Sequence, residues 1–386
     1  MWEGSLNGER TMDFELSDEQ RLLQDSVSRL MADRYSFEQR KGYLKTPEGF
    51  SAALWSQYAD LGLLGLPFAE EYGGFGGGAQ EIMLVMQAFG RALTLEPYLA
   101  TVVLGGAALR HGGSDHQKAA ILPAIAEGSM KLAFAHSERQ ARYDLTDVLT
   151  TAKRSGGGWV LDGSKSVVVH GEAADKLVLS ARTSGDRYDE HGITLFLVDA
   201  AAPGVARRGY ATRDEQRAAD IALSNVAVSD ADVLGEVGQG LAIVQRVVEA
   251  GIAATAAECV GAMEAMHSMT LEYSKTREQF GKPIGSYQVV QHRLADMFMT
   301  MEQGRSMAML ATMMVDQPDA DERARKIAMA KVGVGQAGRY VSQSAIQMHG
   351  GIGMTEEYAV GHYFRRCMAI ERLFGDPAYY LQKLAA

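Results

Sequence analysis

The chain has 386 residues, of which 38 are basic and 48 are acidic, so its formal net charge is −10. With 47% hydrophobic residues the composition is typical of a globular protein, and the length predicts two or three domains. The excess of acidic groups argues against nucleic acid as a partner, because nucleic-acid binding depends on clustered basic residues.

The cysteine content is low. Only Cys259 and Cys367 occur, far apart in the sequence, which argues against a disulfide scaffold, a structural zinc site or a dithiol redox centre and favours a reducing compartment. No window approaches 18 uninterrupted apolar residues, and the N-terminus lacks a basic region followed by an apolar one. We therefore expect a cytoplasmic protein without a membrane span, and a polar extension at residues 1–11.

Helical patterns dominate the first third of the chain. Ser17 to Gln20 has the form of a capping box, and apolar residues follow at three-to-four spacing as far as Met31. Further helical stretches are predicted around residues 48–64, 79–92 and 97–111. These patterns predict an N-terminal helical domain over residues 12–130.

The apolar period changes from about residue 131. Short β-branched or aromatic runs at 159–161, 167–169, 177–179 and 193–198 are predicted strands. The dipeptide Asp162-Gly163 lies between the first two runs and predicts a hairpin turn. A central β-domain is therefore expected over residues 131–236.

Helical spacing returns after Gly235 and continues toward Tyr273, and two more long helical patterns cover about 284–315 and 321–348. They predict a C-terminal helical bundle domain over residues 237–386. Helices followed by strands and then helices favour an α+β fold rather than a wound βαβ sheet.

Two motif readings are rejected. Gly333 to Gly338 fits the expression GxGxxG, but it lies inside a helical pattern with no strand before it, so it predicts close helix packing rather than a dinucleotide site. The nine histidines contain no HExxH motif, and no metal site is expected.

Two segments are far more specific, namely YSKTREQFGKPI at 273–284 and QMHGGIGM at 347–354. With LGLLGLPFAEEYGG at 61–74, they resemble the signature regions of the flavin-dependent acyl-CoA dehydrogenase family over nearly the whole chain. The resemblance implies that family's α+β fold, with a C-terminal four-helix bundle that assembles a tetramer. It also implies FAD as cofactor, an acyl-CoA substrate, electron-transfer flavoprotein as electron acceptor, and a role in fatty acid or sterol side-chain degradation.

The resemblance also assigns cofactor-binding residues. Arg277 carries a charged donor fork suited to a pyrophosphate, and the Gly350-Gly351 backbone allows close approach of the cofactor. In the family, the matching positions hold the adenine and pyrophosphate half of an FAD bound chiefly to a neighbouring subunit. The full predicted set is Arg277, Phe280, Gln288, Gln347, Gly350, Gly351, Phe134, Ser137 and Val169.

The catalytic base is where the sequence departs from the family. In the family a glutamate takes the α-proton of the acyl-CoA, and Phe374 occupies that position here. An alternative base position on the first long C-terminal helix aligns with Gly251. Asp376 is the nearest carboxylate in the sequence and is the one candidate base. On the flavin side, Val167-Val168-Val169 replaces the usual Trp-Ile-Thr.

Three hypotheses follow from this pattern. The chain resembles the base-less small subunit of heteromeric members such as pimeloyl-CoA dehydrogenase, which completes FAD sites whose carboxylate comes from another polypeptide. The second is a self-sufficient homotetramer with an atypical base. The third is a non-catalytic scaffold or binding homologue. FAD content separates the third hypothesis from the first two.

Overall fold

The computed structural model describes residues 15–385, so the predicted extension at 1–11 lies outside the described residues. Its first part is helical, and α1 (Asp18–Arg34) begins at the predicted capping box, where the Ser17 and Gln20 side chains each accept the other residue's backbone N–H. The remaining helices of this part are α2 (Phe37–Tyr43), α3 (Ala52–Asp60), η1 (Glu70–Tyr72), α4 (Ala79–Ala92), η2 (Leu99–Gly105), α5 (Gly106–Gly112) and α6 (Asp115–Ala126).

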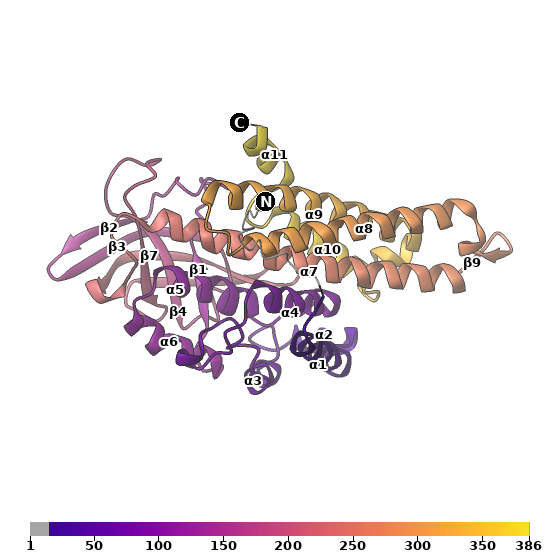
Figure 1. The fold of residues 1–386 in the computed structure, drawn as a ribbon, viewed down its shortest axis with the longest axis horizontal. Coiled ribbons are helices and arrows are strands. Elements are labelled where there is room, and N and C mark those ends of the chain that lie inside the picture. Colours follow the sequence, from indigo (N-terminus) through magenta and orange to yellow (C-terminus); the bar gives the residue numbers. More distant parts are fainter. Residues whose placement is uncertain (1–14, 386) are drawn as a thin grey trace, which may run out of the picture.

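The middle part is an eight-stranded sheet at one end of the molecule (Figure 1). The strand order is β6-β7-β3-β2-β4-β5-β8, and β1 pairs in parallel with β4. The strands are β1 (Leu132–Ala135), β2 (Thr151–Ser155), β3 (Gly158–Val169), β4 (Lys176–Arg182), β5 (Ile193–Asp199), β6 (Val205–Ala211), β7 (Arg217–Ser229) and β8 (Val233–Leu234), with η3 (Asp230–Asp232) before β8.

The hairpin predicted at Asp162-Gly163 is wrong. Both residues lie inside β3, where the pairing with β7 shifts register between Leu161 and Gly163. Gly163 has φ +148°, and a Cβ there would lie 2.6 Å from the Thr150 Oγ1, so glycine is required by an irregularity in the strand rather than by a chain reversal. An Asp-Gly dipeptide occurs both in hairpin turns and in β-bulges. Which of the two forms depends on the strands that pair with it.

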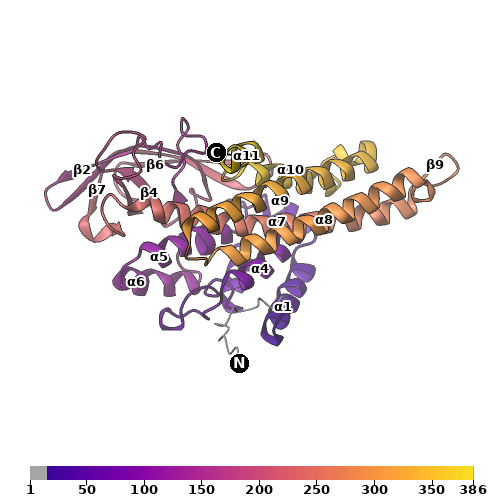
Figure 2. The same cartoon turned by 45° about the horizontal axis from the view of Figure 1, so that its top comes forward.

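The third part is a bundle of long helices. It contains α7 (Gly240–Thr276), α8 (Gln288–Met314), α9 (Ala320–His349), α10 (Val360–Arg372) and α11 (Pro377–Ala385), with a small hairpin of β9 (Glu278–Gln279) and β10 (Lys282–Pro283) and the turns η4 (Ile284–Ser286) and η5 (Gly350–Met354). Figures 1 and 2 both place the sheet at one end of α7 and the β9 hairpin at the other. The predicted order of helices, sheet and helices is confirmed.

The GxGxxG sequence lies within α9, as predicted. A Cβ on Gly333 would lie 2.7 Å from the Met307 side chain, and one on Gly338 would lie 2.7 Å from the Cys259 sulfur. These glycines therefore allow α9 to pack closely against α8 and α7. By length and composition, α7 alone among the described helices could cross a membrane, but 72% of its most apolar stretch is buried inside the protein.

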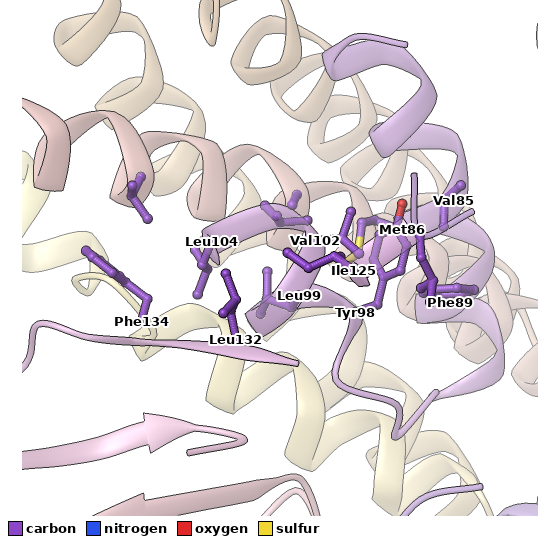
Figure 3. Close-up of a cluster of buried hydrophobic side chains, with 14 of the residues drawn as sticks. Val85, Met86, Phe89, Tyr98, Leu99, Val102, Leu104, Ile125, Leu132 and Phe134 are labelled. Carbon is purple, nitrogen blue, oxygen red and sulfur yellow. The ribbon is translucent and has the colours of Figure 1, made fainter. Parts of the chain in front are cut away.

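The largest hydrophobic core joins all three parts. Phe89 and Leu104 come from the N-terminal helices and Leu132 and Phe134 from β1 (Figure 3), and α7 contributes Val248 to the same core. Each of these side chains is at least 93% buried, and burying a side chain of this size contributes about 1.5–3 kcal/mol. The core therefore fixes the end of β1 against α7, which is where the candidate site lies.

Candidate functional site

A cavity of about 650 Å³ lies where the sheet meets the C-terminal helices, and we call it the interdomain cavity. This volume lies in the range of small-molecule binding sites. The end of β1 contributes Phe134 and His136, the end of β3 contributes Val169, α7 contributes Val248, and the segment between α10 and α11 contributes Phe374. With Leu104 of η2, which also lines the cavity, all three parts of the chain form its wall.

The predicted flavin-side residues meet in this cavity. Phe134, Ser137 and Val169 all line it, although they come from separate strands or their ends. Ser137 is fixed because its carbonyl accepts the Ser166 N–H at 2.9 Å. The wall around Phe134 and Val169 is apolar and suits a flat ring system. The structure therefore brings together the residues that the sequence assigned to one half of the cofactor.

Phe374 is held with its ring in the cavity. It has φ +63°, a conformation that costs energy for a bulky residue and needs support from its surroundings. The buried Lys331 ammonium group donates to the carbonyls of Ile370 at 2.6 Å and Leu373 at 2.7 Å, and the Tyr380 hydroxyl donates to the Phe374 carbonyl at 2.8 Å. Burial lowers the pKa of Lys331 to about 8.

Gly251 lies directly against Phe374. A Cβ on Gly251 would lie 2.8 Å from two carbon atoms of the Phe374 ring and 2.8 Å from a methyl carbon of Leu104. The two positions at which the sequence lacks a base are therefore in direct contact, one on α7 and the other in the segment after α10. The phenyl ring fills the space that a side chain at 251 would need.

The carboxylates that do line the cavity are all engaged. Glu138 accepts from the Lys165 ammonium at 2.7 Å and from the backbone N–H groups of Leu149 and Thr150. Burial opposes its ionisation, but the Lys165 charge and these donors outweigh burial and lower the pKa of Glu138.

The other three carboxylates in the wall have partners of their own. Asp147 forms a two-point ion pair with Arg187, Asp220 pairs with Arg208, and Asp144 accepts two hydrogen bonds from Thr146. Within residues 15–385, no carboxylate in this wall is therefore free of a donor.

Asp376, the candidate base, does not line the interdomain cavity. Its Oδ1 accepts the Tyr379 N–H at 2.8 Å, and Pro377 follows it as the first residue of α11. This is the geometry of a helix cap, in which the side chain satisfies an N–H that the helix leaves free. Asp376 borders a separate hollow beside Arg339 and Arg372.

The remaining predicted FAD residues gather at the far end of the bundle, and we call them the terminal patch: Arg277, Phe280, Gln288, Gln347, Gly350 and Gly351. Arg277 ends α7, and Phe280 is 92% exposed at the tip of the β9 hairpin. The Tyr273 ring stacks on His349 with centroids 4.5 Å apart, which joins the end of α7 to the end of α9. The structure therefore brings the two motifs together.

The chemistry of the terminal patch fits the anionic end of a dinucleotide. A guanidinium and two exposed carboxamides offer charged and neutral donors, and Phe280 offers a ring face. Apart from their immediate chain neighbours, none of the described residues has an atom within 4 Å of a Cβ placed on Gly350 or Gly351, so their backbone is open to a ligand. The side chains and the backbone are thus all accessible.

The interdomain cavity and the terminal patch are too far apart to share one cofactor. Gly251 and Arg277 are 26 positions apart along α7, and at the helical rise of about 1.5 Å per residue about 39 Å separates them. This exceeds the length of an extended FAD. An FAD whose ring lies in the cavity therefore needs its anionic end held by something other than this chain's own terminal patch.

Two cavity residues carry features that the sequence did not assign. Leu104 crowds Gly251 from η2, and His136 lies between Phe134 and Phe374. Leu104 belongs to no recognisable sequence motif. It reaches the site only because η2 packs against α7. His136 carries a sequence signal, since a histidine interrupts an otherwise apolar stretch at the end of β1.

The chain matches three domains of one protein family. The acyl-CoA dehydrogenase N-terminal domain matches residues 17–129, the middle domain matches residues 133–226, and the C-terminal domain matches residues 238–385. Together these matches cover the N-terminal helices, most of the sheet and the bundle.

Individual relatives agree with the family matches. The chain is 30% identical over 373 residues to the short-chain specific acyl-CoA dehydrogenase of Megasphaera elsdenii, covering 92% of this chain and 94% of that protein. It is 29% identical over 380 residues to the probable acyl-CoA dehydrogenase YngJ of Bacillus subtilis, covering 97% and 98%. The solved ChsE4-ChsE5 complex from Mycobacterium tuberculosis contains a chain that superposes with a TM-score of 0.86 at 28% identity, covering 97% of this chain and 98% of that one.

Proposed function

The chain belongs to the acyl-CoA dehydrogenase family, whose cofactor is FAD, and we propose that it is a subunit that lacks the usual catalytic glutamate and works with a second polypeptide. The proposed reaction is the α,β-desaturation of an acyl-CoA thioester. One observation carries the proposal: Phe374 fills the base position against Gly251, while the terminal patch keeps its full set of donors.

The reaction needs two acceptors. FAD, when bound, accepts the hydride that leaves the β-carbon, so a base must take the proton that leaves the α-carbon. The Phe374 ring cannot accept a proton, and the four carboxylates in the cavity wall are held by donors. Another subunit is therefore the proposed source of the base.

The terminal patch is the proposed contribution of this chain to its partner. Arg277 would hold the pyrophosphate, Gln288 and Gln347 would donate to polar edges of the nucleotide, and the Phe280 ring would pack on it. The separation of about 39 Å along α7 supports an exchange of FAD halves between subunits. The ChsE4-ChsE5 complex shows that a relative of this fold assembles from two kinds of chain.

Further parts of the proposal follow from the family. We propose a tetramer built as a dimer of dimers, with electron-transfer flavoprotein as the electron acceptor. The exposed apolar side chains Val289, Phe298 and Met299 on α8 support assembly, because an exposed apolar helix face is typical of an interface.

The test is to purify the chain alone and after co-expression with a carboxylate-bearing homologue. We expect little flavin and slow turnover from the chain alone, since an absent base costs about 10²–10⁴-fold in rate. The co-purified assembly should show bound flavin that a suitable acyl-CoA bleaches. Robust turnover by this polypeptide alone would instead establish the self-sufficient enzyme, and an assembly without flavin would favour the non-catalytic scaffold.

A further inference from the structure

Three aromatic rings stand side by side in the wall of the interdomain cavity. The Phe134 and His136 rings are stacked with centroids 4.6 Å apart and an angle of 18° between their planes. The His136 and Phe374 rings are 6.2 Å apart at 25°. The imidazole therefore lies between two phenyl rings, one from β1 and the other from the segment after α10.

The backbone on both sides of His136 is fixed, so the ring has little freedom to find another partner. Ala135 pairs with Leu179 at the end of the parallel β1 and β4 ladder. The Lys165 ammonium group, itself held by Glu138, donates to the His136 carbonyl at 3.3 Å. The direction of the imidazole is thus set by the sheet.

The imidazole of His136 is polar but unpaired. Its Nδ1 is buried and makes no hydrogen bond of normal geometry with any residue in the described part of the chain. Burial and the positive charge of Lys165 lower the pKa of His136 to about 4, so the ring is neutral at neutral pH, with one nitrogen that donates and one that accepts. Buried polar atoms of folded proteins nearly always have a partner, and the part of the His136 ring that stays accessible borders the cavity.

Three of the four tyrosines that line the same cavity have their hydroxyls satisfied within the protein. Tyr210 donates to Asp220, Tyr379 donates to the Tyr143 carbonyl, and Tyr380 donates to the Phe374 carbonyl. His136 differs from them because its ring lines the cavity and, within residues 15–385, neither ring nitrogen makes a hydrogen bond of normal geometry.

We propose that His136 is a specificity-determining residue of the interdomain cavity, whose neutral imidazole hydrogen-bonds to an uncharged polar group of the bound ligand. The surrounding Phe134, Phe374 and Leu104 side chains disfavour a charged group at this depth, because an ion buried among apolar side chains loses its hydration. Two ligands supply such a group: a carbonyl or ring nitrogen of the flavin, and the carbonyl of an acyl thioester. The inference rests on the proposed function, since both ligands belong to it.

The experiment compares His136→Val with His136→Asn in the FAD-containing assembly. Valine removes both nitrogens, whereas asparagine keeps a donor and an acceptor on a shorter side chain. FAD affinity and the visible spectrum of the bound flavin are measured first. Binding of an acyl-CoA analogue that keeps the thioester carbonyl but has a sulfur atom in place of the β-carbon, so that it cannot be desaturated, is then measured by calorimetry.

We expect His136→Val to weaken one of the two ligands about three- to tenfold, and His136→Asn to restore part of the loss. A changed flavin affinity and spectrum identifies the flavin as the partner of His136. A changed analogue affinity with an unchanged flavin spectrum identifies the acyl group. A merely structural role would leave the flavin spectrum unchanged and would not be rescued by asparagine.

Two outcomes contradict the inference, and they can be told apart. If the Val variant binds FAD and the analogue as the parent does, His136 has no role in recognition, while the proposed function stands. If neither the parent nor the variants bind FAD or the analogue in any assembly, the proposed function fails and the inference fails with it. A thermal unfolding curve of each variant shows that a lost affinity is not a lost fold.

Discussion

The ring of Phe374 lies on the α-carbon of Gly251, so that the two positions from which a base is missing are packed against each other. The two residues are complementary in size, because the large side chain at position 374 fits only when position 251 has no side chain. The packing of this chain therefore leaves no room for a base at position 251. A carboxylate side chain could be placed there only if Phe374 or Leu104 moved.

This contact predicts coupling between the two positions. Gly251→Ala should destabilise the fold by about 1–3 kcal/mol, because the new methyl group would meet the Phe374 ring at 2.8 Å. In a Phe374→Ala background the same change should cost much less. The free energy of unfolding of the four proteins, measured in urea, gives the coupling. Additive costs would show that the ring moves aside freely.

A carboxylate at position 374 should restore base catalysis. Phe374→Glu places a proton acceptor in the interdomain cavity, and a positioned base contributes about 10²–10⁴-fold to the rate. The measurement is the anaerobic reduction of bound flavin by acyl-CoA, in an assembly whose partner carries glutamine in place of its catalytic glutamate. Phe374→Gln is the matched control, since it has the same shape without basicity. Equal rates for Glu and Gln would show that residue 374 does not reach the α-carbon.

Arg277→Ala should lower flavin occupancy of the assembly. A hydrogen bond to a charged group contributes about 1.5–3 kcal/mol, so the Kd for FAD should rise about ten- to a hundredfold. Arg29→Ala, which removes an exposed arginine on α1 that is not part of the terminal patch, is the control. Flavin content and affinity are read from absorbance and from titration of the apoprotein. An unchanged Kd for Arg277→Ala would remove this residue from the cofactor site.

The order of the three domains was predictable because long helices and strands carry distinct apolar periods, as in α4 and α9. The irregularity in β3 at Asp162-Gly163 could not be predicted, because a glycine with positive φ occurs in bulges as well as in hairpin turns. Only the pairing with β7 distinguishes the two. The vacancy at 251 was visible in the sequence, yet its contact with Phe374 depends on how α10 ends against α7. The partnerless nitrogen of His136 likewise becomes visible only when the cavity is formed.

Asp376 should behave as a helix cap rather than as a base. Asp376→Asn should leave flavin reduction and stability nearly unchanged, because asparagine also accepts the Tyr379 N–H. Asp376→Ala should lower the free energy of unfolding by about 1 kcal/mol, the usual cost of a lost cap. Unfolding curves and flavin bleaching by acyl-CoA test both variants. Loss of bleaching in Asp376→Asn with full flavin retention would instead restore Asp376 as the base.

Three partly or fully buried histidines predict that the fold loses stability in mild acid. Burial is the main cause that lowers the pKa of His111, His136 and His170 to about 4 each, whereas the unfolded chain titrates near the ordinary value of 6.5. Between these values the unfolded state binds more protons than the folded state, so the free energy of unfolding rises with pH from about 4 to about 6.5 and levels off above. The slope should be smaller in His136→Val, which has one fewer such group. The measurement is the urea midpoint at half-unit steps from pH 4.5 to 7.5. A His136→Val profile parallel to that of the parent would mean that the pKa of His136 is the same in the folded and unfolded states, which would contradict a pKa lowered by its surroundings in the cavity wall.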